Sequence, residues 1–94
     1  MFVYQVFNTC TFKCYIGKTR STVEKRWDRH CRAAYKVPTG KIDLAIRLYG
    51  KEVFKISVLG EYSTQEELDE AEVYFIKYYK TLHPAGYNVR KGPC

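Results

Sequence analysis

Residues 15–30, YIGKTRSTVEKRWDRH, decide how the rest of this chain folds. The stretch leaves a short apolar segment through Gly17 and reaches a capping box, Ser21-x-x-Glu24, whose two side chains satisfy opposite free N–H groups of a helix start. A helix is therefore predicted from residue 22 to residue 34. The strand end, the turn and the helix bring four polar side chains close together: Tyr15, Lys18, Arg26 and His30.

An extended segment precedes this stretch and pairs with its beginning. Residues 2–7, FVYQVF, are β-branched and aromatic and are followed by turn-forming residues, so they predict a strand. Residues 13–17, KCYIG, predict the returning strand of a hairpin. Side chains alternate along a strand, so Tyr15 and Gly17 share a face, and the glycine leaves room for another group to approach the backbone.

The remainder of the chain predicts two helices and a strand. A short helix over residues 41–49 has apolar residues at helical spacing, and residues 53–59 alternate as a third strand. A second capping box, Ser63-x-x-Glu66, opens a long helix over residues 64–82 that Pro84 should stop.

This order of elements predicts an α+β domain, in which a small three-stranded antiparallel sheet is flanked by three helices. The 94 residues carry no repeat, low-complexity tract or linker, so residues 1–94 are expected to form one domain.

The charge balance favours a polyanionic partner. Sixteen Lys and Arg against ten Asp and Glu give a net charge of +6 and a pI near 9.2, although many soluble domains are equally basic. No apolar run approaches the roughly 18 residues of a membrane span, and the N-terminus lacks a secretory pattern. These features predict an intracellular, non-secreted protein without a membrane partner.

The four cysteines, Cys10, Cys14, Cys31 and Cys94, are irregularly spaced and, without a secretory signal, are expected to be reduced. A zinc-stabilised interaction domain is an alternative that requires them to cluster. No C-x-x-C pair supports that alternative.

A lone carboxylate interrupts the apolar side of the last predicted helix. At about 100° per residue, Glu72 falls in the same stripe as Leu68, Phe75 and Ile76. An unpaired buried carboxylate costs several kcal/mol or is neutralised. Glu72 therefore needs a cation, either an arginine or a metal, and the simpler alternatives are an ion pair with Arg26 or a solvated edge position.

His30 is equally out of place among the apolar residues of the helix over residues 22–34. Taken alone, it is most simply a hydrogen-bonded core histidine, and Tyr4 and Tyr15 are most simply core aromatics. Arg26, however, lies one helical turn before His30, and an arginine beside an imidazole suits the binding and neutralisation of a phosphate. The helix start also favours an anion.

Taken together, these residues resemble the GIY-YIG nuclease family over essentially the whole chain. The resemblance includes Tyr15-Ile16-Gly17, the preceding Phe2-Val3-Tyr4, in which Phe2 and Val3 replace the family's glycine and isoleucine, and the terminal Gly86-Tyr87-Asn88. It is greatest to the N-terminal catalytic domain of phage homing endonucleases. The ordered set that carries it is Tyr4, Tyr15, Gly17, Arg26, His30, Glu72 and Asn88.

The resemblance implies a metal-dependent DNA endonuclease that hydrolyses phosphodiester bonds. Glu72 would be the single protein ligand of a Mg²⁺ or Mn²⁺ ion, and Tyr4 would position or deprotonate the attacking water with help from Tyr15 and His30. Arg26 would stabilise the developing charge. Because tyrosine ordinarily has a pKa near 10, either cations must lower the pKa of Tyr4 or His30 must take its proton onward.

Basic side chains are expected to hold the DNA backbone without reading bases, and Asn88 is expected to support the site. The predicted DNA-contacting residues are Lys18, Arg20, Lys25, Arg29, Arg32, Asn88 and Lys91. Homing enzymes of the family carry a separate DNA-binding region after the nuclease domain, so this chain is either an excised domain or a stand-alone nuclease. A phage, a virus or a mobile element fits as its source. The rival hypothesis is a non-catalytic nucleic-acid-binding module.

Overall fold

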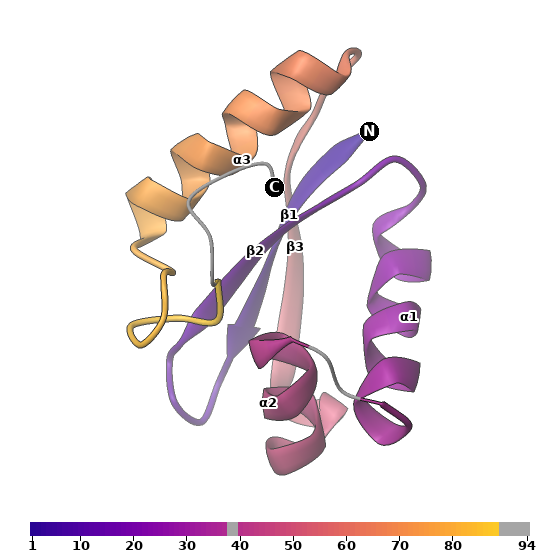
Figure 1. The fold of residues 1–94 in the computed structure, drawn as a ribbon, viewed down its shortest axis with the longest axis vertical. Coiled ribbons are helices and arrows are strands. Elements are labelled where there is room, and N and C mark those ends of the chain that lie inside the picture. The colour runs from indigo at the N-terminus through magenta and orange to yellow at the C-terminus, as the bar shows by residue number, and fades with distance from the viewer. Residues whose placement is uncertain (38–39, 89–94) are drawn as a thin grey trace.

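The computed structural model describes residues 1–37 and 40–88 and confirms the predicted α+β architecture. These residues form a three-stranded antiparallel sheet, three α-helices and a short 3₁₀ helix (Figure 1). In chain order the elements are β1 (Phe2–Asn8), β2 (Cys14–Thr19), α1 (Val23–Tyr35), α2 (Lys41–Tyr49), η1 (Lys51–Val53), β3 (Phe54–Glu61) and α3 (Gln65–Tyr79).

The sheet has the order β2-β1-β3, so the first strand lies in the centre. Both neighbours of β1 run antiparallel to it, and Tyr4 stands opposite Gly17 on β2 and Val58 on β3. A register shift between Val3 and Tyr4 marks a bulge in the pairing of β1 with β3. Tyr4 therefore sits in the middle of the sheet, with the edge strand β2 beside it.

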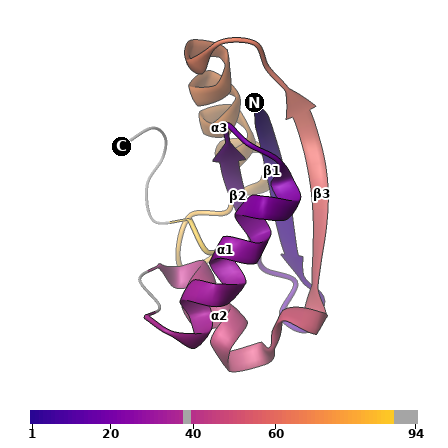
Figure 2. The same cartoon turned by 90° about the vertical axis from the view of Figure 1, so that its right-hand side faces the viewer.

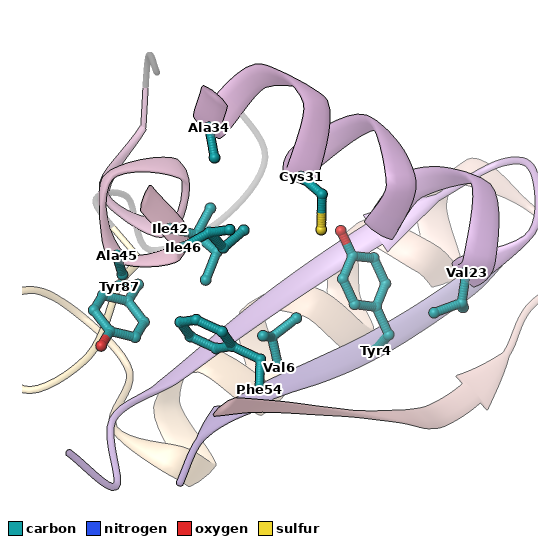
Figure 3. Close-up of a cluster of buried hydrophobic side chains, with 10 residues drawn as sticks. All are labelled: Tyr4, Val6, Val23, Cys31, Ala34, Ile42, Ala45, Ile46, Phe54 and Tyr87. Carbon is teal, nitrogen blue, oxygen red and sulfur yellow. The ribbon is translucent and has the colours of Figure 1, made fainter. Parts of the chain in front are cut away.

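Helices cover both faces of the sheet: α1 and α2 lie on one face and α3 lies on the other (Figures 1 and 2). Because side chains alternate along β1, Tyr4 and Val6 enter a core shared with α1 and α2 (Figure 3). Val3 instead joins a second core with Leu68 and Ile76 of α3. A residue of β2 can thus face either helix layer, depending on its register.

Two helices begin one residue later than the predicted capping boxes. Thr22, rather than Ser21, caps α1 by accepting a hydrogen bond of 3.3 Å from the Lys25 N–H. Thr64, rather than Ser63, caps α3 by accepting one of 3.2 Å from the Glu67 N–H. The boxes at Ser21-x-x-Glu24 and Ser63-x-x-Glu66 are therefore wrong by one residue, although the elements they open are correct.

The last helix also ends earlier than predicted. It stops at Tyr79 because Lys80 adopts a left-handed conformation, with φ of 53°, and its N–H bonds the Ile76 carbonyl. The predicted end at Leu82, before Pro84, is therefore three residues too late.

The segment that follows α3 closes part of the outer edge of β2. The Tyr87 N–H donates to the Cys14 carbonyl at 2.9 Å, and the Asn88 side-chain amide bonds both the N–H and the carbonyl of Ile16, each at 2.8 Å. Asn88 thereby takes the place of a neighbouring strand at Ile16. Asn88 is only 6% exposed and holds β2 in place, and the expected DNA contact at this residue stays a prediction.

No helix among the described residues is long and apolar enough to cross a membrane.

Three cysteines lie in the described part of the chain and are free thiols. Cys10 is exposed, Cys14 is half-buried and Cys31 is buried. Within the same part of the chain, no three His, Cys, Asp or Glu side chains group to hold a metal, so the zinc alternative has no structural support there. Cys94 lies outside the described residues.

Candidate active site

The site begins with the ring of Tyr4, which lies over Gly17 on the neighbouring strand. A Cβ atom added to Gly17 would overlap both the ring and the hydroxyl of Tyr4. This confirms the prediction that Gly17 lets another group approach the backbone. The Tyr4 side chain is fully buried, and its hydroxyl points toward α1 (Figure 3).

The hydroxyl of Tyr4 meets a histidine that a second helix holds from behind. The Tyr4 oxygen lies 3.2 Å from Nε2 of His30, and Nδ1 of the same ring lies 3.0 Å from Oδ1 of Asp43. His30 comes from α1, and Asp43 comes from the first turn of α2. A continuous buried chain of polar groups therefore joins α2 to the central strand.

Burial acts on both titrating members of this chain. It raises the pKa of Tyr4 far above its ordinary value of about 10, with Tyr15 adding to the rise and Arg26 opposing it. Burial also lowers the pKa of His30, against the favourable charge of Asp43. Burial therefore works against the first of the two expected routes to an active Tyr4, a pKa lowered by cations. The contact with Nε2 agrees with the second route, transfer of the Tyr4 proton to His30.

Tyr15 and Arg26 complete this half of the site. The Tyr15 ring meets the His30 ring edge-on, with centroids 5.6 Å apart, and lies 6.4 Å from the Tyr4 ring. Arg26 is half-buried and close enough to Tyr4 to lower its pKa by charge and by a hydrogen bond. The predicted group of Tyr15, Lys18, Arg26 and His30 is therefore only partly present. Tyr15, Arg26 and His30 meet here around Tyr4, whereas Lys18 pairs with acids of α3 on the other face of β2.

Glu72 lies on the other side of β2, on α3, and the cation beside it is a lysine, which was not one of the expected partners. That cation is Lys18 rather than Arg26: its Nζ atom lies 3.3 Å from Oε1 of Glu72 and 2.7 Å from Oδ1 of Asp69. The Glu72 side chain is 12% exposed. Burial raises the pKa of Glu72, and the charge of Lys18 opposes the rise.

The pKa shifts of Lys18 and Asp69 agree with an ion pair between them. Partial burial opposes the charge of Lys18, but its hydrogen bond to Asp69 and the charge of Glu72 raise its pKa overall. The hydrogen bond from Lys18 in turn lowers the pKa of Asp69. The Lys18 ammonium would thus have to leave Glu72 and Asp69 before it could make the expected contact with DNA.

The donor set at Glu72 fits a hard divalent cation that is only partly held by protein. Mg²⁺ keeps several waters and commonly takes one or two carboxylates plus substrate phosphate oxygens. Glu72 supplies one carboxylate at the edge of the sheet, and Asp69 lies one helical turn away on α3. The chemistry of these residues is compatible with the predicted single ion.

The remaining predicted DNA contacts divide by position. Arg20, in the turn before α1, is exposed, as are Lys25, Arg29 and Arg32 along α1. Arg32 forms an exposed ion pair of 2.7 Å with Asp28. Lys91 lies outside the described residues.

Sequence reasoning missed two acidic residues of the site, Asp43 and Asp69. Asp43 lies three residues before Ile46, a buried residue of the same helix, and so carries the same signal that singled out Glu72: an acid on an apolar helix face. Asp69 directly follows Leu68, and no sequence signal distinguishes it from the other acids of α3. Only the packing of α3 against β2 brings it to Lys18.

Fold and site together define a class of small α+β domains. In this class two tyrosines of a β-hairpin meet an arginine and a histidine of the next helix, and a glutamate of the last helix lies on the other face of the edge strand. Residues 1–88 match the model of the GIY-YIG catalytic domain, and the chain belongs to this family. The family's motif glycine and isoleucine are replaced here by Phe2 and Val3, which pack into the two cores.

Two solved structures share this fold. A point mutant of the catalytic domain of intron endonuclease I-TevI superposes with a TM-score of 0.85 at 29% identity, over 97% of this chain and 94% of that one. The catalytic domain of homing endonuclease I-TevI gives a TM-score of 0.79 at 30% identity, over 94% of this chain and 96% of that one.

A viral protein is similar in sequence. Uncharacterized protein 019R of Invertebrate iridescent virus 6 is 31% identical over 84 residues, which is 87% of this chain. The match spans 30% of the length of that protein. The similarity therefore concerns one domain of a longer relative.

Proposed function

We propose that this chain is a metal-dependent DNA endonuclease domain that hydrolyses phosphodiester bonds with little sequence specificity of its own. Membership of the GIY-YIG family and similarity to a homing endonuclease domain support a nuclease. The observation that carries the chemical proposal is the buried contact of 3.2 Å between the Tyr4 hydroxyl and Nε2 of His30. A phenol against an imidazole offers a route for the proton of an attacking water.

The proton path follows from the raised pKa of Tyr4. Its phenol stays protonated at neutral pH, so it cannot remove a proton from water unless it gives up its own. His30 is neutral there because burial lowers its pKa, and its Nε2 is within reach. We propose that the Tyr4 proton passes to His30 as the water proton passes to Tyr4.

Arg26 is proposed to bind the substrate phosphate and, by moving toward it, to expose the Tyr4 hydroxyl. Tyr4 has no exposed surface, so water reaches it only after a neighbour moves. Arg26 is half-buried and adjoins Tyr4, and a guanidinium binds phosphate oxygens well. A phosphate that draws Arg26 away from Tyr4 would both open the hydroxyl and place a charge where negative charge develops.

Glu72 is proposed to be the protein ligand of one Mg²⁺ or Mn²⁺ ion. Such an ion supplies Lewis-acid stabilisation of the phosphate oxygens. Lys18 lies 3.3 Å from Glu72, so a divalent ion would compete with this ammonium. Lys18 is then free to hold a DNA phosphate while keeping Asp69 in reach.

Backbone contacts are proposed for Arg20, Lys25, Arg29 and Arg32, which are all exposed. Lys91 remains a proposed contact of the same kind. A longer protein with a separate DNA-binding region, and an intracellular location where DNA is found, are part of this proposal.

A plasmid-nicking assay tests the proposal directly. We expect cleavage of supercoiled DNA with Mg²⁺ or Mn²⁺, none with EDTA, and none from Glu72→Gln under any condition. Isothermal titration with Mn²⁺ should show weaker binding to Glu72→Gln than to Glu70→Gln, a matched acid on the exposed side of α3. DNA binding without cleavage in either metal would instead support a non-catalytic module, the second candidate, which the ion pair of Lys18 with Glu72 favours because it gives the buried acid a structural partner.

A further inference from the structure

Both ring nitrogens of His30 are hydrogen-bonded, one to a residue of the sheet and the other to a residue of α2. Nδ1 lies 3.0 Å from Oδ1 of Asp43, and Nε2 lies 3.2 Å from the hydroxyl of Tyr4. The exposed fractions are 7% for His30, 5% for Asp43 and 0% for Tyr4. Water therefore does not exchange freely with any of the three side chains, and each hydrogen bond has to be made within the protein.

The proton on the ring can be placed from these contacts. A carboxylate only accepts hydrogen bonds, so Nδ1 must donate to Asp43. A neutral imidazole carries one N–H, so Nε2 then has a free lone pair and accepts from the Tyr4 hydroxyl. The direction of both hydrogen bonds thus follows from Asp43.

We propose that Asp43 is a positioning residue that fixes His30 in the Nδ1–H tautomer, so that Nε2 is always ready to receive the proton of Tyr4. The inference rests on the proposed function for its use in catalysis. During the reaction, the water O–H bond breaks as a new O–H bond forms on Tyr4, and the former Tyr4 proton bonds to Nε2. His30 then carries a positive charge, which the Asp43 carboxylate faces.

The charges around His30 show why this carboxylate is needed. Arg26 and Arg29 of the same helix disfavour a positive ring, and burial disfavours it most. Tyr15 of β2 and Tyr4 of β1 face the ring as neutral aromatics. Asp43 of α2 is the group that lowers the cost of protonating His30, by hydrogen bond and by charge.

An alternative role for Asp43 would be to stabilise its own helix, α2. It stands in the first turn of α2, where an acid interacts favourably with the helix dipole, a contribution of about 0.3–1 kcal/mol. That role predicts a small loss of stability on substitution and no change in the tautomer of His30. The two roles therefore differ in a spectroscopic observable.

Long-range ¹H–¹⁵N NMR of the imidazole nitrogens, without DNA or metal, tests the proposal. The chain has two histidines, so His83→Gln leaves His30 as the single imidazole and removes any ambiguity of assignment. In this background we expect the Nδ1–H tautomer. Asp43→Asn should give a mixture of tautomers and lower the pKa of His30, because the favourable carboxylate is lost. The control Glu52→Gln, which removes an acid from the exposed turn after α2, should change neither.

Kinetics provide the second readout. Asp43→Asn should reduce single-turnover cleavage by at least about 10²-fold, within the usual range for a proton-transfer group, and move the acid limb of the pH profile to lower pH. Nε2–H in the unsubstituted site, or an unchanged tautomer and His30 pKa in Asp43→Asn, would overturn the proposal. The unsubstituted tautomer is decisive even if Asp43→Asn fails to fold, and the NMR result does not depend on whether the chain cuts DNA.

Discussion

The ammonium of Lys18 lies 3.3 Å from Oε1 of Glu72, across the edge of the sheet from the Tyr4–His30 pair. Lys18 and Tyr15 belong to the same strand, but alternation along β2 places them on opposite faces. Lys18 reaches α3, and Tyr15 reaches α1. The edge strand thus carries one half of the site on each face, and the absent side chain of Gly17 lets Tyr4 lie against it.

Removing the charge of Glu72 should abolish cleavage and leave the fold intact. In Glu72→Gln, Lys18 keeps its ion pair of 2.7 Å with Asp69, so no unpaired ammonium remains. We expect the free energy of unfolding to change by about 1 kcal/mol or less, as for a partly exposed pair. Thermal melting and nicking assays on Glu72→Gln and Glu70→Gln check this, and extensive unfolding of Glu72→Gln would make the residue structural.

Arg26→Ala should lose far more rate than affinity. Its charge is needed where negative charge develops, whereas Arg29 and Arg32 are exposed on the outer side of α1. Arg29→Ala and Arg32→Ala should instead weaken DNA binding and reduce its salt dependence by up to about one phosphate contact each. Single-turnover rates and binding isotherms at several salt concentrations separate the two effects. Equal losses of affinity alone at all three positions would contradict a catalytic Arg26.

The sequence predicted elements and single site residues well, but it could not predict which partner each side chain meets. Gly17, His30 and Glu72 stood out because each breaks a local pattern. Lys18 carried no such signal, since its pairing with Glu72 depends on how α3 packs against β2. The capping errors have a local origin, because Ser21 and Thr22 both offer a hydroxyl. Ser21 is instead held by Thr19, whose Oγ1 accepts from its N–H at 3.1 Å.

The end of α3 was unpredictable for a different reason. Lysine rarely adopts a left-handed conformation, yet Lys80 does so here. The turn aligns Thr81 with Asn88, whose side chains are joined at 2.7 Å, and Asn88 in turn holds Ile16. A long-range requirement of the edge strand thus overrides local preference.

Gly17→Ala should disturb the site more than its small size suggests. The added methyl group would overlap the ring and hydroxyl of Tyr4, and overpacking of this kind costs roughly 1–3 kcal/mol. We expect a lower melting temperature and a rate loss similar to that of removing the Tyr4 hydroxyl. Gly40→Ala is the control, because a Cβ there meets no atom of the described residues within 4 Å. Equal effects of the two substitutions would mean that Tyr4 can move without consequence.

The pKa of His30 predicts how stability depends on pH. Because folding lowers this pKa, the unfolded chain binds more protons than the folded chain once the pH falls below about 6.5. The contribution of His30 is therefore fully present above that pH and is lost as the pH drops through the lowered pKa. Glu72, whose pKa is raised, acts in the opposite sense at more acidic pH. Urea unfolding between pH 5.5 and 8 should show a smaller loss of stability in His30→Gln than in the unsubstituted chain.

Tyr4→Phe separates catalysis from packing, because it deletes one hydroxyl from an otherwise identical buried ring. If Tyr4 relays the water proton, the single-turnover rate should fall by roughly 10²–10⁴-fold, the usual contribution of such a group. Nε2 of His30 also loses its partner, which should cost about 1 kcal/mol of stability. Metal binding should stay unchanged.

Tyr15→Phe is the matched variant, since its half-buried ring adjoins both Tyr4 and His30. We expect Tyr15→Phe to lose less rate than Tyr4→Phe, because the contact with Nε2 belongs to Tyr4. Rates under single-turnover conditions, with melting temperatures measured alongside, decide between them. Near-normal turnover of Tyr4→Phe together with a large loss in Tyr15→Phe would assign the water to the more accessible tyrosine. The contact between Tyr4 and His30 would then serve to hold the histidine rather than to carry a proton.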